Sequence, residues 1–357
     1  MRKITIVTRS MYAGGAERVI AQLANYFAEN EYITKIVTID DEKVLYELNE
    51  RIELVPIGKK KENKLSDKIF RYKELRKMIV SDLPDLVLSM PEDIGIYVIL
   101  ALLGTKIPVY VSERNNPWVM PDVKVTRILR KLMYPFAKGI IFQTEMAKSF
   151  FSKSIQKKGI VLGNPVDEKR IPEPFRGERE KIIVAAGRLD KQKNFPLLIN
   201  AFSLNVQKHP EYKLVIFGEG RLRNELEKLV AQLNLQDKVS LPGRKSDLLM
   251  QMRKAAMFVL SSDYEGLPNV LIEAMCMGMP VISTDCPSGG PKQLIENGKN
   301  GILISVNNKE KLATAIDRLT DTNYARSLGE EAYKLRKKVT DQQVFVEWEK
   351  YLFNEKK

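Results

Sequence analysis

Short runs of apolar residues alternate with longer stretches of helical periodicity along the whole chain. This alternation is typical of βα units that build a parallel sheet. In the first half it predicts strands at residues 4–8, 34–38, 86–89, 109–112 and 139–143, and helices over 15–29, 68–81, 94–103, 124–136 and 146–152. In the second half it predicts strands at 182–186, 213–217, 239–241, 257–261, 280–284 and 301–304, and helices over 196–208, 221–233, 245–254, 268–277, 291–296 and 309–319.

The rhythm breaks once, around Asn164-Pro165, and the polar, proline-containing residues 166–181 predict an interdomain linker. A chain of 357 residues also fits two domains better than one. We therefore expect two α/β domains, residues 1–165 and 166–340, each a Rossmann-like, doubly wound sheet. Residues 341–357 would form a last amphipathic helix that packs across the linker. Such sheets bind ligands outside the carboxyl ends of their strands, so the expected site is the cleft between the domains.

The composition is that of a soluble globular protein, with 44% hydrophobic and 29% charged residues. The longest apolar stretch runs from Ile94 to Gly104, and a membrane span needs about twenty such residues. The first residues lead directly into a predicted strand, which is not the pattern of a signal peptide. Cys276 and Cys286 lack the spacing of a metal site, and nothing suggests disulfides. We expect a cytoplasmic protein.

The net charge of +13 calls for an acidic partner. Two basic clusters stand out, Lys59 to Lys77 and Lys124 to Lys158, and the second interleaves Leu, Met, Tyr and Phe with its cations. Such a surface can lie on anionic lipid, can serve only as a solvated face that keeps the protein soluble, or can follow nucleic-acid phosphates. We rank these three interpretations of the basic clusters in that order, with an anionic membrane surface first.

The segment from Asp263 to Glu273 is the most specific signal in the sequence. A predicted strand ends in a glutamate-containing loop, and a proline is placed to occupy the first helical position. The free N–H groups of the loop then point outward at a helix N-terminus, which suits an anion or sugar hydroxyls. The two glutamates alone could equally have no binding role. One could be a loop residue that the helix dipole favours, and the other a side chain turned to solvent. The binding groups expected here are Glu265, Gly266, Leu267, Pro268 and Glu273.

This segment resembles the E-x7-E signature of family 4 glycosyltransferases, retaining enzymes of the GT-B fold. Three further stretches resemble motifs of that family in the order it would place them: the N-terminal glycine loop at Ala13–Arg18, the G-R-L-x-x-x-K-N run at Gly187–Asn194, and the G-x-G turn at Phe217–Gly220. The resemblance covers nearly the whole chain. It implies that the first domain binds the acceptor and the second binds a nucleotide-sugar donor.

The departing nucleoside diphosphate needs fixed cations. Arg188 can grip a phosphate with its planar fork, and Lys193 supplies a point charge. Gly14 and Gly15 lack side chains, so their backbone can approach the diphosphate, although a simple tight turn would need them too.

The resemblance assigns the remaining donor contacts. It implies that Glu273 binds the ribose hydroxyls and that Glu265 contacts the transferred sugar. The loop of Arg244 lies where family members hold the base through backbone atoms. We expect Glu265, Arg188 and Lys193 to carry catalysis.

The acceptor side departs from a common family pattern, a histidine after the fourth strand. Here that stretch contains Ser-Glu-Arg-Asn, and the single histidine, His209, stands elsewhere. The variant resembles relatives that build bacterial surface polysaccharides. It makes Arg114 a candidate for binding hydroxyls or phosphate, together with Arg18 and Asn116. Alternatively, Glu113 and Arg114 only pair with each other.

The sequence contains no Asp-x-Asp triplet of the kind that holds a divalent ion in GT-A enzymes. We expect neither a metal nor a cofactor, because cations and backbone N–H groups can neutralise the leaving group. The expected function is retaining transfer of galactose, N-acetylgalactosamine or a gluco relative from a UDP-sugar. The expected acceptor is a polyprenyl-diphosphate-linked glycan at the inner face of the plasma membrane, in bacterial surface polysaccharide synthesis.

Three other functions fit the sequence less well. A non-hydrolysing nucleotide-sugar epimerase shares the fold but needs acid/base side chains, and the poverty in histidine argues against it. A nicotinamide dehydrogenase needs a G-x-G-x-x-G turn followed by an acidic residue, and neither glycine turn fits. Nucleic-acid binding is supported by charge alone.

Overall fold

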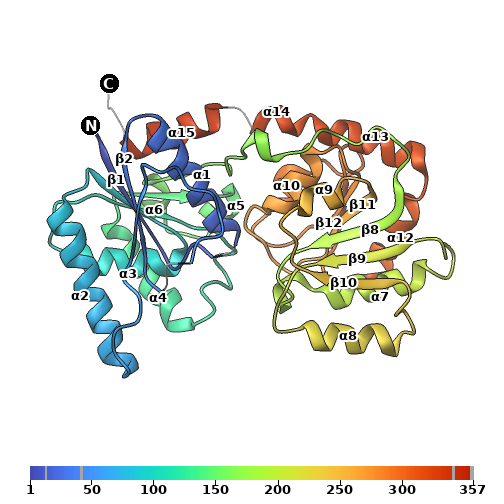
Figure 1. The fold of residues 1–357 in the computed structure, drawn as a ribbon, viewed down its shortest axis with the longest axis horizontal. Helices are drawn as coiled ribbons and strands as arrows, with labels where there is room; N and C mark the ends of the chain where they lie inside the picture. The colour runs from blue at the N-terminus through green and yellow to red at the C-terminus, as the bar shows by residue number, and fades with distance from the viewer. Residues whose placement is uncertain (13, 41–42, 340–341, 354–357) are drawn as a thin grey trace. The chain divides into compact units, whose positions relative to one another are not determined.

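The computed structural model describes the chain except residues 13, 41–42, 340–341 and 354–357. It divides into two compact units, Met1–Val166 with Asp341–Lys357, and Asp167–Thr340. Each unit is a parallel sheet flanked by helices, so each is Rossmann-like (Figure 1). Within the described residues no helix is both long and apolar enough to cross a bilayer.

The sheet of the first unit has the strand order β3-β2-β1-β4-β5-β6-β7, and every neighbouring pair is parallel. Its central strands are buried on both faces, which is why they read as continuous apolar runs. The strands are β1 (Lys3–Thr8), β2 (Ile33–Thr38), β3 (Glu53–Pro56), β4 (Leu86–Ser89), β5 (Val109–Ser112), β6 (Gly139–Phe142) and β7 (Gly159–Val161). The helices are α1 (Gly15–Glu29), α2 (Lys64–Asp82), α3 (Glu92–Leu102), α4 (Lys124–Met133), α5 (Glu145–Ser149), α6 (Lys153–Lys157) and α15 (Gln342–Phe353), with a 3-10 turn at Tyr134–Phe136.

The second unit repeats the plan with the order β10-β9-β8-β11-β12-β13, again all parallel. Its strands are β8 (Glu180–Ala186), β9 (Lys213–Phe217), β10 (Val239–Gly243), β11 (Ala255–Leu260), β12 (Val281–Thr284) and β13 (Ile302–Ile304). Its helices are α7 (Phe195–Asn205), α8 (Arg223–Gln232), α9 (Leu248–Met252), α10 (Asn269–Cys276), α11 (Gly290–Leu294), α12 (Lys309–Arg318), α13 (Thr322–Tyr333) and α14 (Leu335–Val339), with 3-10 turns at Glu168–Arg170 and Lys191–Lys193.

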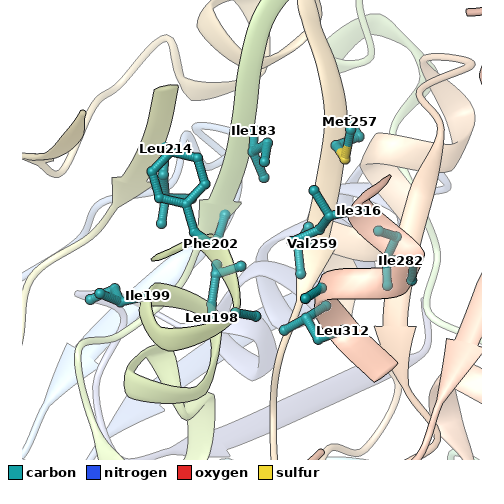
Figure 2. Close-up of a cluster of buried hydrophobic side chains, with 14 of the residues drawn as sticks. Ile183, Leu198, Ile199, Phe202, Leu214, Met257, Val259, Ile282, Leu312 and Ile316 are labelled. Carbon is teal, nitrogen blue, oxygen red and sulfur yellow. The ribbon is translucent and has the colours of Figure 1, made fainter. Parts of the chain in front are cut away.

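A core of buried apolar side chains holds α7 and α12 against the second sheet (Figure 2). Phe202 and Leu198 of α7 and Leu312 of α12 belong to one buried cluster with Ile183 of β8 and Val259 of β11. All five are at most 1% exposed. Burying one such side chain contributes about 1.5–3 kcal/mol. This packing fixes α7, and therefore the loop that joins β8 to α7.

The predicted strands and helices are present, with ends that differ by a few residues. The edge strands β3 and β7 were not predicted; they span only four and three residues, so the apolar run in each is short. The helices α13 and α14 were also not predicted. Helix α15 packs beside α1 within the first unit, where Phe345 stacks on Tyr26 and Trp348 donates from Nε1 to the Gly163 carbonyl (Figure 1).

Candidate active site

Each sheet has one point at which the strand order reverses, between β1 and β4 in the first unit and between β8 and β11 in the second. Loops at the carboxyl ends of such neighbouring strands diverge and leave a crevice in which doubly wound folds bind ligands. Lys193 follows β8 and Glu265 follows β11. The strand order therefore brings together two residues that are 72 positions apart in the sequence.

Lys193 and Glu265 form an ion pair, with 2.5 Å between Nζ and Oε1. Their side chains are only 14% and 8% exposed. The carboxylate also accepts hydrogen bonds from Ser262 Oγ at 2.6 Å and from Gln192 Nε2 at 3.3 Å. A buried charge pair is tolerated only when its remaining hydrogen-bonding capacity is met, as it is here for the carboxylate. The network holds both side chains in place.

Glycines set how closely the loops after β8 and β9 approach. Gly218 has φ +141°, and a Cβ there would lie 1.9 Å from the Gly187 carbonyl oxygen. A Cβ on Gly220 would lie 2.4 Å from the Leu189 carbonyl oxygen. The G-x-G turn at this point therefore serves the packing of one loop backbone on the other, and it supports the loop that carries Lys193.

Helix α10 begins next to this pair. Pro268 is its N-cap residue, with ψ 105°, and Asn269 is the first helical residue. The prediction that Pro268 opens the helix was therefore wrong by one position, because its ψ is extended. A Cβ on Gly290 would lie 1.7 Å from the Gly266 carbonyl oxygen, so the start of α11 packs closely on this loop. Glu273 lies in α10 and is 5% exposed, so it is not a solvated side chain.

The structure does not bring Arg188 into the Lys193–Glu265 network. Its side chain is 72% exposed, and its Nε lies 3.5 Å from Asp190 Oδ2. Arg244 is exposed as well, just after β10. Both arginines stand on loops at the carboxyl end of the second sheet, with exposed side chains.

The glycine loop of the first unit follows β1. Gly14, with φ 144°, is the N-cap of α1, and the Tyr46 hydroxyl bonds both its N–H, at 3.2 Å, and its carbonyl, at 2.7 Å. Gly15 is the first residue of α1, and Arg18 stands about one turn further on. Ala13, which belongs to the same motif, lies outside the described residues.

Arg114 does not pair with Glu113, so that alternative is wrong. Glu113 instead pairs with Arg130 at 3.0 Å, and both side chains are at most 1% exposed. Burial raises the pKa of the Glu113 carboxyl to about 7. Arg114 donates from Nη2 to Asn164 Oδ1 at 2.7 Å. Its Nε and Nη1 are buried and have no hydrogen-bond partner among the described residues, and burial lowers its pKa to about 10.

Asn116 is buried, and its Oδ1 accepts from the Trp118 N–H at 3.0 Å. That bond closes a local turn, so the side-chain oxygen is used by the loop itself. The structure thus gives Asn116 a role in shaping the loop after β5, and acceptor binding by this residue stays a prediction.

Sequence reasoning missed Glu92, Gln192 and Ser262. Glu92 opens α3 directly after β4, is 4% exposed, and its Oε2 accepts from the Arg114 N–H at 3.3 Å. Burial raises the pKa of this carboxyl. A glutamate three residues after the predicted strand 86–89 was the available signal. For Gln192 and Ser262, the only signal available was that they lie close to Lys193 and Glu265 in the sequence.

Two further observations concern the side chains that are available for chemistry. Burial raises the pKa of the Cys286 thiol to about 12, so the thiol stays neutral and is a poor nucleophile. Within the described part of the chain, no group of three or more His, Cys, Asp or Glu side chains is arranged to hold a metal ion.

Comparison with known proteins decides the family. The family model described as "Glycosyl transferases group 1" matches residues 166–335. An N-acetylgalactosamine-N,N'-diacetylbacillosaminyl-diphospho-undecaprenol 4-alpha-N-acetylgalactosaminyltransferase of Campylobacter jejuni is 31% identical, with 96% of each chain covered. The chain belongs to the group 1 glycosyltransferases. A second Campylobacter jejuni enzyme, which adds N-acetylgalactosamine to a diNAcBac-PP-undecaprenol-linked glycan, is 29% identical over 99% of this chain and 98% of its own.

Solved structures place this glycosyltransferase in the GT-B fold. Sucrose-phosphate synthase from Thermosynechococcus elongatus matches with a TM-score of 0.85 at 18% identity, covering 99% of this chain and 98% of that one. Anabaena HepE in complex with UDP and glucose matches with a TM-score of 0.83 at 17% identity, covering 99% and 100%. At such identities the likeness concerns the fold alone.

Proposed function

We propose that this glycosyltransferase moves a hexosyl residue from a UDP-sugar to a lipid-linked glycan with retention of the anomeric configuration. The observation that carries the proposal is the buried Lys193–Glu265 pair at the strand-order reversal of the second unit, beside the start of α10. It combines a cation for phosphate with a carboxylate for hydroxyl groups. The curated relatives, which are named as N-acetylgalactosaminyltransferases, support a hexosamine donor.

In the proposed reaction, the bond between the anomeric carbon and the β-phosphate oxygen breaks. A bond from that carbon to the acceptor oxygen forms on the same face, and the acceptor proton passes to the departing diphosphate. Lys193 and Arg188 would neutralise the charge that develops on the diphosphate. Such electrostatic stabilisation usually contributes most to lowering the barrier in sites of this kind. The N–H groups at the start of α10 would add their dipoles. Glu265 would bind sugar hydroxyls, and Glu273 the ribose.

The first unit would bind the acceptor. Arg114 supports this, because its buried Nε and Nη1 have no hydrogen-bond partner among the described residues, and buried donors of this kind are costly unless a ligand meets them. A diphosphate-linked glycan offers the anionic oxygens that a guanidinium binds best. The two named relatives act on undecaprenol-diphosphate-linked glycans, which supports the same acceptor class here.

The test is product analysis with a panel of UDP-sugars, with and without an undecaprenyl-diphosphate-linked oligosaccharide, and with EDTA in one arm. We expect one new α-linkage, seen by NMR, that forms from an α-configured donor and persists in EDTA. A β-linkage would contradict retention. Epimerised donor in the absence of acceptor would favour the epimerase instead. Activity that EDTA abolishes and Mg²⁺ restores would contradict metal independence.

A further inference from the structure

Helix α4 carries an apolar stripe on its exposed side. Val125, Ile128, Leu129 and Leu132 are 62%, 61%, 37% and 57% exposed. Their spacing of i, i+3, i+4 and i+7 places them on one face of the helix. Phe136, in the 3-10 turn that follows α4, is 63% exposed. A soluble protein leaves single apolar residues exposed, but a contiguous stripe indicates a binding surface.

The loop before α4 extends this surface. Trp118 and Val119 are 45% and 40% exposed. Arg127 of α4 ties the loop to the helix, since its Nη1 donates to the carbonyls of Val119 and Pro121 at 2.8 and 2.6 Å. These hydrogen bonds hold the loop, with its exposed apolar side chains, against the helix.

The charges around the stripe select an anionic, apolar partner. Helix α4 contains Lys124, Arg127 and Lys131 and no acidic residue. The i, i+3 and i+7 spacing of these cations groups them on a face next to the apolar stripe. A basic flank beside an apolar face is the pattern of a helix that lies in the boundary between lipid headgroups and acyl chains. By contrast, α2 contains the acidic residues Asp67, Glu74 and Asp82.

The buried side of α4 reaches the loop that carries Arg114. Arg130 is fully buried. It pairs with Glu113 and donates to the carbonyls of Pro117 and Met120 at 2.7 and 2.9 Å. The helix that carries the apolar stripe is therefore joined to the loop after β5 by an ion pair and hydrogen bonds.

We propose that α4 is an in-plane membrane anchor, which inserts its apolar stripe into an anionic bilayer and thereby sets the loop of Arg114 at the lipid surface. The anchor itself needs only the surface of α4. Its use in presenting a lipid-linked acceptor to Arg114 rests on the proposed function. Electrostatic attraction brings the basic flank to the membrane, and burial of the apolar side chains then holds the helix there.

The chain contains two tryptophans, and this makes the test specific. Trp348 is fully buried, whereas Trp118 belongs to the proposed anchor surface. The full chain is mixed with vesicles of phosphatidylglycerol and phosphatidylcholine that carry bromine on their acyl chains. We expect bromine to quench the fluorescence of the wild type but not that of Trp118→Phe, in which only Trp348 remains.

Sedimentation with the same vesicles tests the stripe. Ile128→Ser/Leu132→Ser should lower the partition coefficient at least about tenfold, as expected when two half-exposed apolar side chains lose their burial. The matched control, Leu204→Ser/Met250→Ser, removes two exposed apolar side chains from the second unit and should bind as the wild type does. Wild-type binding should weaken in about 1 M NaCl but persist, because salt screens only the charges.

Three results would overturn the anchor: unchanged binding by the Ile128/Leu132 variant, complete loss of wild-type binding in high salt, or a wild-type dimer in sedimentation velocity that the variant abolishes. The last would mean that a second copy covers α4. UDP binding, measured by calorimetry on the same samples, separates the two proposals. If the variant loses vesicles and keeps UDP, the anchor is supported. If the wild type binds vesicles but not UDP, the donor assignment fails while the anchor stands.

Discussion

Removing the Lys193 ammonium should damage stability and catalysis separately, and the structure sets the size of each effect. Lys193→Met leaves the Glu265 carboxylate, which is 8% exposed, without its cation. Breaking a fully buried pair costs about 3–5 kcal/mol. The carboxylate keeps its bonds from Ser262 and Gln192, and the Lys193 side chain is 14% exposed. We therefore expect a loss of about 2 kcal/mol in the free energy of unfolding.

A double-mutant cycle isolates the pair. Glu265→Gln should cost a similar amount, because it leaves the ammonium uncompensated. Lys193→Met/Glu265→Gln should cost less than the sum of the two, by at least about 1 kcal/mol. The assay is urea denaturation followed by circular dichroism. Lys191→Met, an exposed lysine in the same 3-10 turn, is the matched control and should stay within about 0.5 kcal/mol of the wild type.

Ligand addition then separates binding from folding. UDP at about 100 times its Kd should stabilise the wild type by about 2.7 kcal/mol. It should stabilise Lys193→Met far less if Lys193 contacts the diphosphate, and kcat/KM should fall about 100-fold. Additivity of the two single variants within about 0.3 kcal/mol would refute the argument that burial couples the two charges. Equal stabilisation of wild type and Lys193→Met by UDP would refute the diphosphate contact.

Three further variants test other parts of the argument. Arg188→Ala should leave stability within about 0.5 kcal/mol, since the side chain is 72% exposed, yet lower kcat/KM about 100-fold, as kinetics and urea denaturation together would show. Gly218→Ala should cost at least about 2 kcal/mol in urea denaturation, because its Cβ would meet the Gly187 carbonyl, whereas Gly104→Ala, with φ +78° and open space, should cost only the backbone strain of about 1–2 kcal/mol. Burial raises the pKa of Glu113 to about 7 from 4.5, so the folded state holds this proton more tightly, and the stability of the wild type relative to Glu113→Gln should fall as the pH rises between these values. A stability difference between the two proteins that does not change with pH over this range would contradict the raised pKa of Glu113.

The local pattern of the sequence determined most of the secondary structure. Strands such as β4 and β9 are apolar runs because parallel strands under helices are buried on both faces. Consecutive residues of such a strand are therefore apolar. The same reasoning could not find β3 and β7. These strands lie at the edges of the first sheet and span only four and three residues, so their apolar runs are too short to stand out from the loops around them. The motif around Glu265 could also be predicted from the sequence, because its loop, proline and helix follow one another along the chain.

Which side chains meet was decided by tertiary structure. Lys193 and Glu265 pair because β8 and β11 are neighbours at the strand-order reversal. The sequence of neither loop indicates this strand order. Glu113 stands next to Arg114 in sequence but pairs with Arg130, which α4 brings over it. Successive residues at the end of a strand point to opposite sides, so adjacency in the chain keeps such charges apart. Only packing of a distant helix on the sheet could give the buried carboxylate its cation.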